Sequence, residues 1–181
     1  MSISLSLTFR RPLRTRRRYD NDSVRVSSPL TQHRASAQTW AAQPASAQSQ
    51  VTFVPGNFLA PTLEETKIPQ GKPTYLIRHV LHDWTDDEVV AILKNVRAAM
   101  TAGRSDSAGS GTLLLCEMLL RPASSRFVRT TSMQLLALND GVTRTDAEMV
   151  KLVETAGFEV RRIHDMRAVD SIIEATPNLD F

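Results

Sequence analysis

A histidine and an aspartate, His82 and Asp83, stand at the end of an apolar segment of strand character, Tyr75 to Leu81. A helix is expected to begin at once, because Thr85 and Glu88 have the spacing of a capping box. A histidine at the carboxyl end of a strand can take a proton near neutral pH, and open α/β sheets bind ligands at that edge. The local pattern by itself favours a packed histidine beside a helix start, and proton transfer is the alternative.

Strand and helix patterns alternate over the rest of residues 51–181, which predicts an α/β fold with a doubly wound sheet. The strand near residue 115 should be central and buried on both faces, and the last two strands should form an antiparallel pair. Side chains alternate along a strand, so His79 should face a packed layer on the side opposite to His82. The expected strands are 51–54, 75–81, 112–119, 158–164 and 168–174, and the expected helices are 86–101, 126–138 and Thr145 to Gly157.

Residues 1–50 differ sharply in composition from the rest of the chain. They carry eight arginines, no lysine and two aspartates, whereas residues 51–181 carry 14 basic and 17 acidic residues. Their serine, alanine, glutamine and arginine content predicts a disordered basic tail. The first 18 residues resemble a mitochondrial transit peptide, and a basic patch for nucleic acid or anionic lipid is a second interpretation. We favour a third, in which translated non-coding sequence replaces the true upstream region.

Cysteine content excludes a disulfide-stabilised domain, and hydropathy argues against a membrane-spanning protein. Cys116 is the chain's one cysteine, so no internal disulfide can form, and its place in an apolar run predicts burial. No uninterrupted apolar stretch approaches the length of a membrane span. We therefore expect no membrane partner. We also expect no nucleic acid as partner. A cytoplasmic location is the default expectation, and the arginine-rich amino terminus makes a mitochondrial one the alternative.

Three segments occur in a particular order along the chain: LHDWTDDE at 81–88, a strand that ends in Glu117, and DGVTRTDAEMVKLVETAGFEV at 140–160. In this order the chain resembles, from about Val51 to Pro177, the carboxyl-terminal part of the plant and fungal S-adenosylmethionine-dependent O-methyltransferases, which include caffeate and flavonoid O-methyltransferases. The resemblance implies a partial Rossmann-like domain over 51–181, S-adenosylmethionine as cofactor, and a hydroxyl of a small aromatic compound as acceptor.

The resemblance also implies the residues that carry the chemistry. His82 matches the general base of the family, and Glu117 matches the acid that orients this base. A second acid is expected immediately before the Arg-Thr pair, but that position holds Thr143, which cannot compensate the charge on an imidazolium. Asp83 is expected to cap the following helix or to bind backbone amides.

Five further residues match positions that contact small molecules in the family. On the cofactor side these are Asn57 and Phe58, where the family has an aspartate before the hydrophobic residue, and Arg78, where it often has a lysine. On the acceptor side they are Met133, which suits a flat aromatic compound, and Asn139. Three of them have a structural alternative: a turn for Asn139, a solvent-exposed strand end for Arg78, and core packing for Met133.

Residues 1–55 contain no glycine, so they cannot supply the glycine-rich turn that brings backbone close to a cofactor in Rossmann-like folds. We therefore expect the chain to bind S-adenosylmethionine weakly or not at all. Three hypotheses follow: a truncated O-methyltransferase, a non-catalytic remnant that forms a homodimer or associates with an intact paralogue, and a binding module with an arginine-rich tail.

Overall fold

The computed structural model of the protein describes residues 54, 56–102 and 111–181. The chain divides after Pro55, and the unit Gly56–Phe181 contains all of the helices and strands reported below. The predicted tail over 1–50 lies outside the described residues, as does nearly all of the predicted strand at 51–54.

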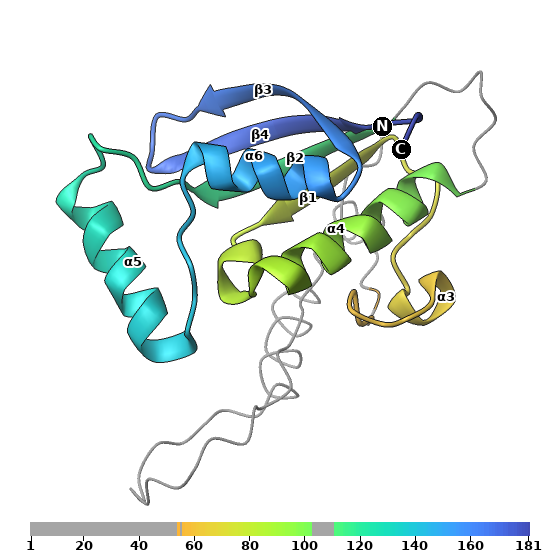
Figure 1. Cartoon of the computed structure of the whole chain (residues 1–181), viewed down its shortest axis with the longest axis horizontal. Coiled ribbons are helices and arrows are strands. Elements are labelled where there is room, and N and C mark those ends of the chain that lie inside the picture. The colour runs from red at the N-terminus through yellow and green to blue at the C-terminus, as the bar shows by residue number, and fades with distance from the viewer. Residues whose placement is uncertain (1–53, 55, 103–110) are drawn as a thin grey trace, which may run out of the picture. The chain divides into compact units, whose positions relative to one another are not determined.

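The order of elements follows the alternation expected from the sequence (Figure 1). The elements are α3 (Leu63–Thr66), β1 (Thr74–Arg78), the 3₁₀-helix η1 (Leu81–Asp83), α4 (Asp86–Thr101), β2 (Thr112–Met118), α5 (Arg126–Asn139), α6 (Asp146–Thr155), β3 (Phe158–Asp165) and β4 (Asp170–Pro177).

The four strands form one mixed sheet in the order β1-β2-β4-β3. β1 and β2 run parallel, with Arg78 opposite Cys116 at their carboxyl ends. β4 runs antiparallel to both of its neighbours, so the predicted antiparallel pair of final strands is confirmed. The carboxyl ends of β1 and β2 therefore meet at one edge, from which the chain continues into η1 and toward α5 (Figure 1).

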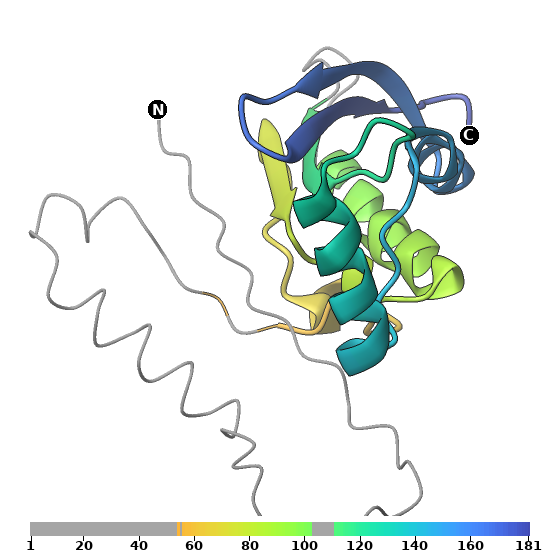
Figure 2. The same cartoon turned by 90° about the vertical axis from the view of Figure 1, so that its left-hand side faces the viewer.

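Helices α4 and α6 pack beside each other on one face of the sheet (Figures 1 and 2). β2 is central, as predicted, but only one of its faces is fully buried: Leu113 and Leu115 are covered, whereas Leu114 and Met118 on the other face are partly exposed. The prediction of burial on both faces is therefore wrong. The buried face of α4 consists of apolar residues at helical spacing, among them Val89, Ile92, Leu93, Val96 and Met100.

Both predicted capping boxes form and fix where α4 and α6 begin. The hydroxyls of Thr85 and Thr145 each accept a backbone N–H three residues ahead, and the carboxylates of Glu88 and Glu148 accept the N–H of the capping residue in return. The chain leaves α6 through Gly157, whose φ of 84° is left-handed, as expected of a glycine beyond a helix end. Cys116 is buried, as predicted.

Strand β1 ends earlier than the sequence predicts, at Arg78, because His79 has a φ of 52° and so turns the chain out of the strand. Residues 81–83 then form η1. The predicted strand over 75–81 is therefore wrong in its last three residues. The rings of His79 and His82 consequently lie 6.1 Å apart rather than on opposite faces, and the side chain of His79 is 44% exposed rather than packed.

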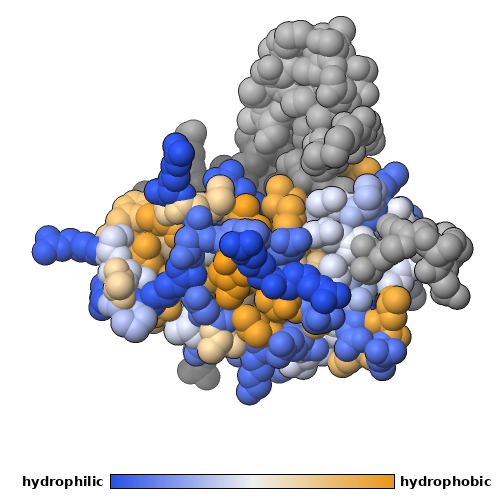
Figure 3. All heavy atoms as spheres, turned by 90° about the horizontal axis from the view of Figure 1, so that it is seen from above, coloured by the Kyte–Doolittle hydropathy of each residue, from blue (hydrophilic) through white to orange (hydrophobic). Residues whose placement is uncertain are grey.

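Charged and apolar side chains are interspersed on the face seen from above Figure 1 (Figure 3). On β3, Arg161 pairs with Glu159, and the ring of His164 lies 2.9 Å from the carboxylate of Glu174 on β4. Within the described ranges, no helix is both long and apolar enough to span a membrane.

Candidate active site

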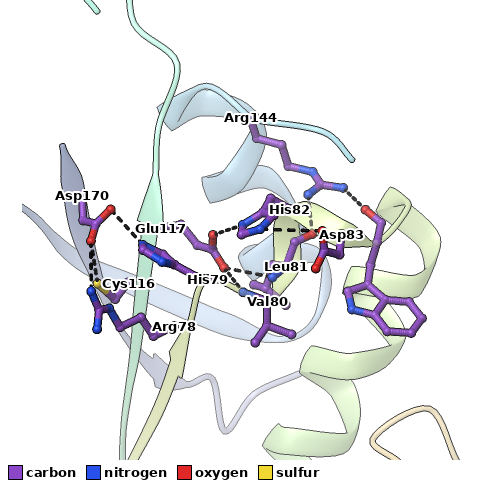
Figure 4. Close-up of polar contacts among 11 residues, drawn as sticks. Arg78, His79, Val80, Leu81, His82, Asp83, Cys116, Glu117, Arg144 and Asp170 are labelled. Atoms are coloured by element: carbon purple, nitrogen blue, oxygen red, sulfur yellow. Dashed lines mark hydrogen bonds and ion pairs between the residues drawn. The ribbon is translucent and has the colours of Figure 1, made fainter. Parts of the chain in front are cut away.

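Glu117 is the buried centre of a hydrogen-bond cluster at the carboxyl ends of β1 and β2 (Figure 4). One carboxylate oxygen, Oε1, accepts the backbone N–H groups of Val80 and Leu81, both at 2.9 Å. The other, Oε2, lies 2.9 Å from Nδ1 of His82. A carboxylate with three donors is fixed in position, so the structure brings His82 and Glu117 together as the sequence resemblance implied.

The contact with Glu117 defines which ring nitrogen of His82 is available for chemistry. Nδ1–H donates to the carboxylate, which leaves the lone pair on Nε2. The hydrogen bond with Glu117 raises the pKa of His82 above its usual value of 6.5, and burial of the ring opposes this shift. The side chain is 18% exposed, so the imidazole is partly covered yet reachable. These are the properties of a positioned proton acceptor.

Asp83 lies on the Nε2 side of the same ring, which corrects our expectation that it caps the next helix. The residue that caps α4 is Thr85. Oδ1 of Asp83 is 3.7 Å from Nε2 of His82, and this buried oxygen has no hydrogen bond within the described part of the chain. Its negative charge also raises the pKa of His82. Thr143, where the resemblance implied a second acid, is buried, and Asp83 instead supplies a second negative charge near the ring.

Arg144 is a site residue to which the sequence assigned no role. Its side chain is 1% exposed, and its guanidinium donates to the carbonyls of Leu81 (2.9 Å) and Trp84 (2.7 Å), beside His82 (Figure 4). It also donates to the carboxylate of Asp86. Nothing local to the sequence indicates this burial, because an arginine just before a helix cap is commonly exposed. The burial depends on the carbonyls of Leu81 and Trp84, which flank His82 and lie about 60 residues earlier in the sequence. A sequence pattern cannot reveal so distant a partner.

A second group of polar side chains surrounds Asp170, at the start of β4 (Figure 4). His79 lies 2.9 Å from Oδ1 of Asp170, and Arg78 lies 3.7 Å from Oδ2. The thiol of Cys116 is 3.9 Å from Oδ2, and burial, followed by the charge of Asp170, raises its pKa. This thiol is therefore protonated at neutral pH and is no nucleophile. No group of three metal-binding side chains occurs in the described ranges.

The residues expected near the cofactor differ in how open they are. Arg78 is 63% exposed at the carboxyl end of β1, and Asn57 is exposed, with Oδ1 accepting the N–H of Leu59. Both can still present polar atoms to a bound molecule. Phe58 is 4% exposed, and its ring meets the ring of Trp84 edge-on at 5.4 Å. Arg78 and Asn57 are thus accessible to solvent, whereas the ring of Phe58 is covered.

The two residues expected near the acceptor both lie on α5, which follows β2. Met133 is 72% exposed, so its thioether is available to a ligand and does not belong to the core. The side chain of Asn139 lies outside what the structure describes, although its backbone is the last residue of α5.

Comparison with known families identifies residues 33–159 as a match to the family described as an O-methyltransferase domain. This match begins upstream of the motifs that carry the sequence resemblance, and so takes in residues 33–50. O-methyltransferase tpcA of Aspergillus fumigatus is 30% identical over 147 residues, which cover 71% of this chain and 28% of that protein. A mitomycin biosynthesis 6-O-methyltransferase of Streptomyces lavendulae is 40% identical over 112 residues, covering 61% of this chain and 28% of that protein.

A solved O-methyltransferase, NcsB1 from neocarzinostatin biosynthesis, has a similar fold over the matched part, with a TM-score of 0.59 and 29% identity. The similarity covers 82% of this chain and 38% of NcsB1, which was solved in complex with S-adenosylmethionine and 2-hydroxy-5-methyl naphthoic acid. The predicted fold, a part of a Rossmann-like methyltransferase domain, is confirmed by this likeness. The chain nevertheless spans less than a third of the length of the two curated relatives.

Proposed function

Because this chain belongs to the family of O-methyltransferase domains, we propose that it takes part in methyl transfer to a hydroxyl group of a small aromatic acceptor, with His82 as the general base. The observation that carries the proposal is the 2.9 Å contact between Nδ1 of His82 and the buried carboxylate of Glu117. That contact leaves the lone pair of Nε2 for the proton of the acceptor hydroxyl.

The physical reason for a base is the weak nucleophilicity of a protonated hydroxyl. A phenol has a pKa of about 10, so removal of its proton as the new bond forms accelerates transfer by about 10²–10⁴-fold. As Nε2 of His82 takes that proton, the imidazolium gains stabilisation from Glu117 on one side and from Asp83 on the other. Two nearby carboxylates therefore favour the charged ring that the reaction produces.

S-adenosylmethionine is the cofactor of the methyltransferases to which this chain is similar, and it would supply an electrophilic methyl group. Arg78 and Asn57 are the exposed polar residues that would hold it, at the edge of the sheet and at the turn after Gly56. Met133 of α5 would contact the acceptor, since its side chain is exposed and suits an aromatic ring. Asn139 and Phe58 remain predictions from the resemblance.

The test is methyl transfer from labelled S-adenosylmethionine, at millimolar concentration, to a panel of hydroxylated aromatic compounds. His82→Gln keeps the size and polarity of the side chain but removes the base, so the rate should fall by about 10²–10⁴-fold. His164→Gln is the matched control, because His164 also lies 2.9 Å from a glutamate, Glu174, but on β3. It should leave the rate unchanged.

Two results would count against this function. One is transfer that His82→Gln leaves intact in a folded protein, which would remove His82 from the reaction. The other is an absence of transfer to every acceptor. The second result would favour a non-catalytic role in which the chain associates with a complete methyltransferase. Large exposed apolar side chains on α5 support that second candidate, namely Phe127 (62% exposed), Met133 (72%) and Leu136 (61%).

A further inference from the structure

The turn that carries His82 is held from one side by a single buried cation. Arg144 donates to the carbonyl of Leu81, just before His82, and to the carbonyl of Trp84, two residues after it. The backbone two residues before Arg144 also holds this turn, because the N–H of Val142 donates to the carbonyl of His82 at 2.7 Å. Three carbonyls of the turn, those of Leu81, His82 and Trp84, thus accept hydrogen bonds from the segment that precedes α6. Glu117 accepts the backbone N–H groups of Val80 and Leu81.

The guanidinium of Arg144 is buried, and its positive charge is only partly compensated by its neighbours. A charged side chain that is 1% exposed is costly unless its donors are satisfied, and here they meet two carbonyls and Asp86. Asp86 is itself 69% exposed, so solvent weakens its compensation of the charge. The positive field of Arg144 therefore reaches the imidazole of His82, whose pKa it lowers against the effect of the carboxylates.

We propose that Arg144 is a positioning residue for His82: its guanidinium fixes the turn from Leu81 to Trp84 so that Nδ1 meets Glu117, and its charge favours the neutral imidazole that can accept a proton. The positioning stands on the contacts alone, whereas its value for catalysis rests on the proposed function. Four charged groups lie around His82: Glu117 on β2, Asp83 on η1, Arg144 before α6, and Asp86 on α4 through its pair with Arg144. The ring of His79, after β1, is the other titratable group that faces it.

Both parts of the proposal can be measured by nuclear magnetic resonance on the 15N-labelled 181-residue chain, without cofactor or substrate. The chain has four histidines, and the signals of His82 are those that disappear in His82→Gln. The first readout is the pH midpoint of the His82 titration, which reports the charge around the ring. The second is the hydrogen-bonded Nδ1–H proton, which reports the contact with Glu117.

Three variants separate charge from geometry. Arg144→Met should move the midpoint to higher pH, because it removes a positive charge, and should weaken or abolish the Nδ1–H signal. Arg144→Lys should keep the midpoint nearer to that of the wild type but weaken the signal, because an ammonium group cannot reach both carbonyls and Asp86 together. Asp86→Asn should move the midpoint to lower pH, because the cation loses its compensating charge.

A folded Arg144→Met chain with an unchanged midpoint and an unchanged Nδ1–H signal would overturn the proposal. If Arg144→Met does not fold, Asp86→Asn decides, because a midpoint that stays or rises would overturn the charge effect. A midpoint that rises in Arg144→Met and falls in Asp86→Asn would support the charge effect, since an arginine with a purely structural role gives no such pattern. Failure of the proposed methyl transfer would leave these titrations unaffected, so the two ideas can fail separately.

Discussion

At the scale of single residues, the imidazole of His82 lies between two carboxylates, Glu117 at Nδ1 and Asp83 near Nε2. The hydrogen bond with Glu117 raises the pKa of His82 in the folded chain above the value of the unfolded chain. The protonated ring is therefore favoured by folding. Its contribution to stability is complete below the unfolded pKa of about 6.5 and disappears as the pH rises through the higher folded pKa.

We therefore predict that the stability difference between the wild type and His82→Gln depends on pH. The wild type should gain more stability relative to the variant at about pH 5.5 than at about pH 8, because only the protonated ring carries the extra stabilisation. Urea denaturation of both proteins at each pH measures this difference. A difference that is constant with pH, or larger at pH 8, would contradict the protonation of His82 inferred from its contacts.

Glu117→Gln should reverse the tautomer of His82. The amide oxygen can still accept the N–H groups of Val80 and Leu81, which turns the amide NH₂ toward Nδ1. Nδ1 must then accept, so the ring proton moves to Nε2, and the pKa of His82 falls as the carboxylate charge is lost. Proton–nitrogen correlation spectra distinguish the two tautomers. Glu174→Gln is the control, and retention of Nδ1–H in Glu117→Gln would show that the carboxylate does not set the tautomer.

At the scale of elements, the end of β1 depends on a residue in a conformation that few side chains adopt. His79 has a φ of 52°, which histidine tolerates but a β-branched residue does not. His79→Val should thus cost about 1–3 kcal/mol in free energy of unfolding. His164→Val removes a similar histidine–carboxylate pair from strand β3, where the backbone is extended and valine is favourable, and should cost less than about 0.5 kcal/mol. Equal costs in denaturant titrations would contradict a strained turn at His79.

The features of this site that the sequence predicts are those with local partners, whereas contacts between distant residues were missed. α4 and α6 were predictable because their capping boxes are local, with partners three residues apart. The end of β1 was not, because its turn depends on Glu117 and Asp170, which lie 36 and 91 residues from their partners Leu81 and His79. Arg144 was missed for the same reason, whereas His82 and Glu117 could be paired because a family resemblance, rather than any local pattern, linked them.

At the scale of the whole molecule, this chain matches less than a third of the length of its curated relatives. We predict that the 181-residue chain binds S-adenosylmethionine more weakly than micromolar, because Asn57 is neutral, the ring of Phe58 is covered, and residues 1–55 contain no glycine. Isothermal titration calorimetry measures the affinity. Micromolar binding would mean that residues upstream of Gly56 supply cofactor contacts that the sequence does not reveal.

The most direct test of His82 as the general base is the pH dependence of the methyl transfer rate in the wild type and in His82→Gln. If Nε2 of His82 accepts the proton, the wild-type rate should rise about tenfold per pH unit and then level off, since only the neutral ring can act. Because Glu117 raises the pKa of His82, the midpoint should lie above about pH 6.5. This rising limb should be missing in His82→Gln. A wild-type rate that does not change with pH, or a rising limb that persists in His82→Gln, would contradict the role of His82.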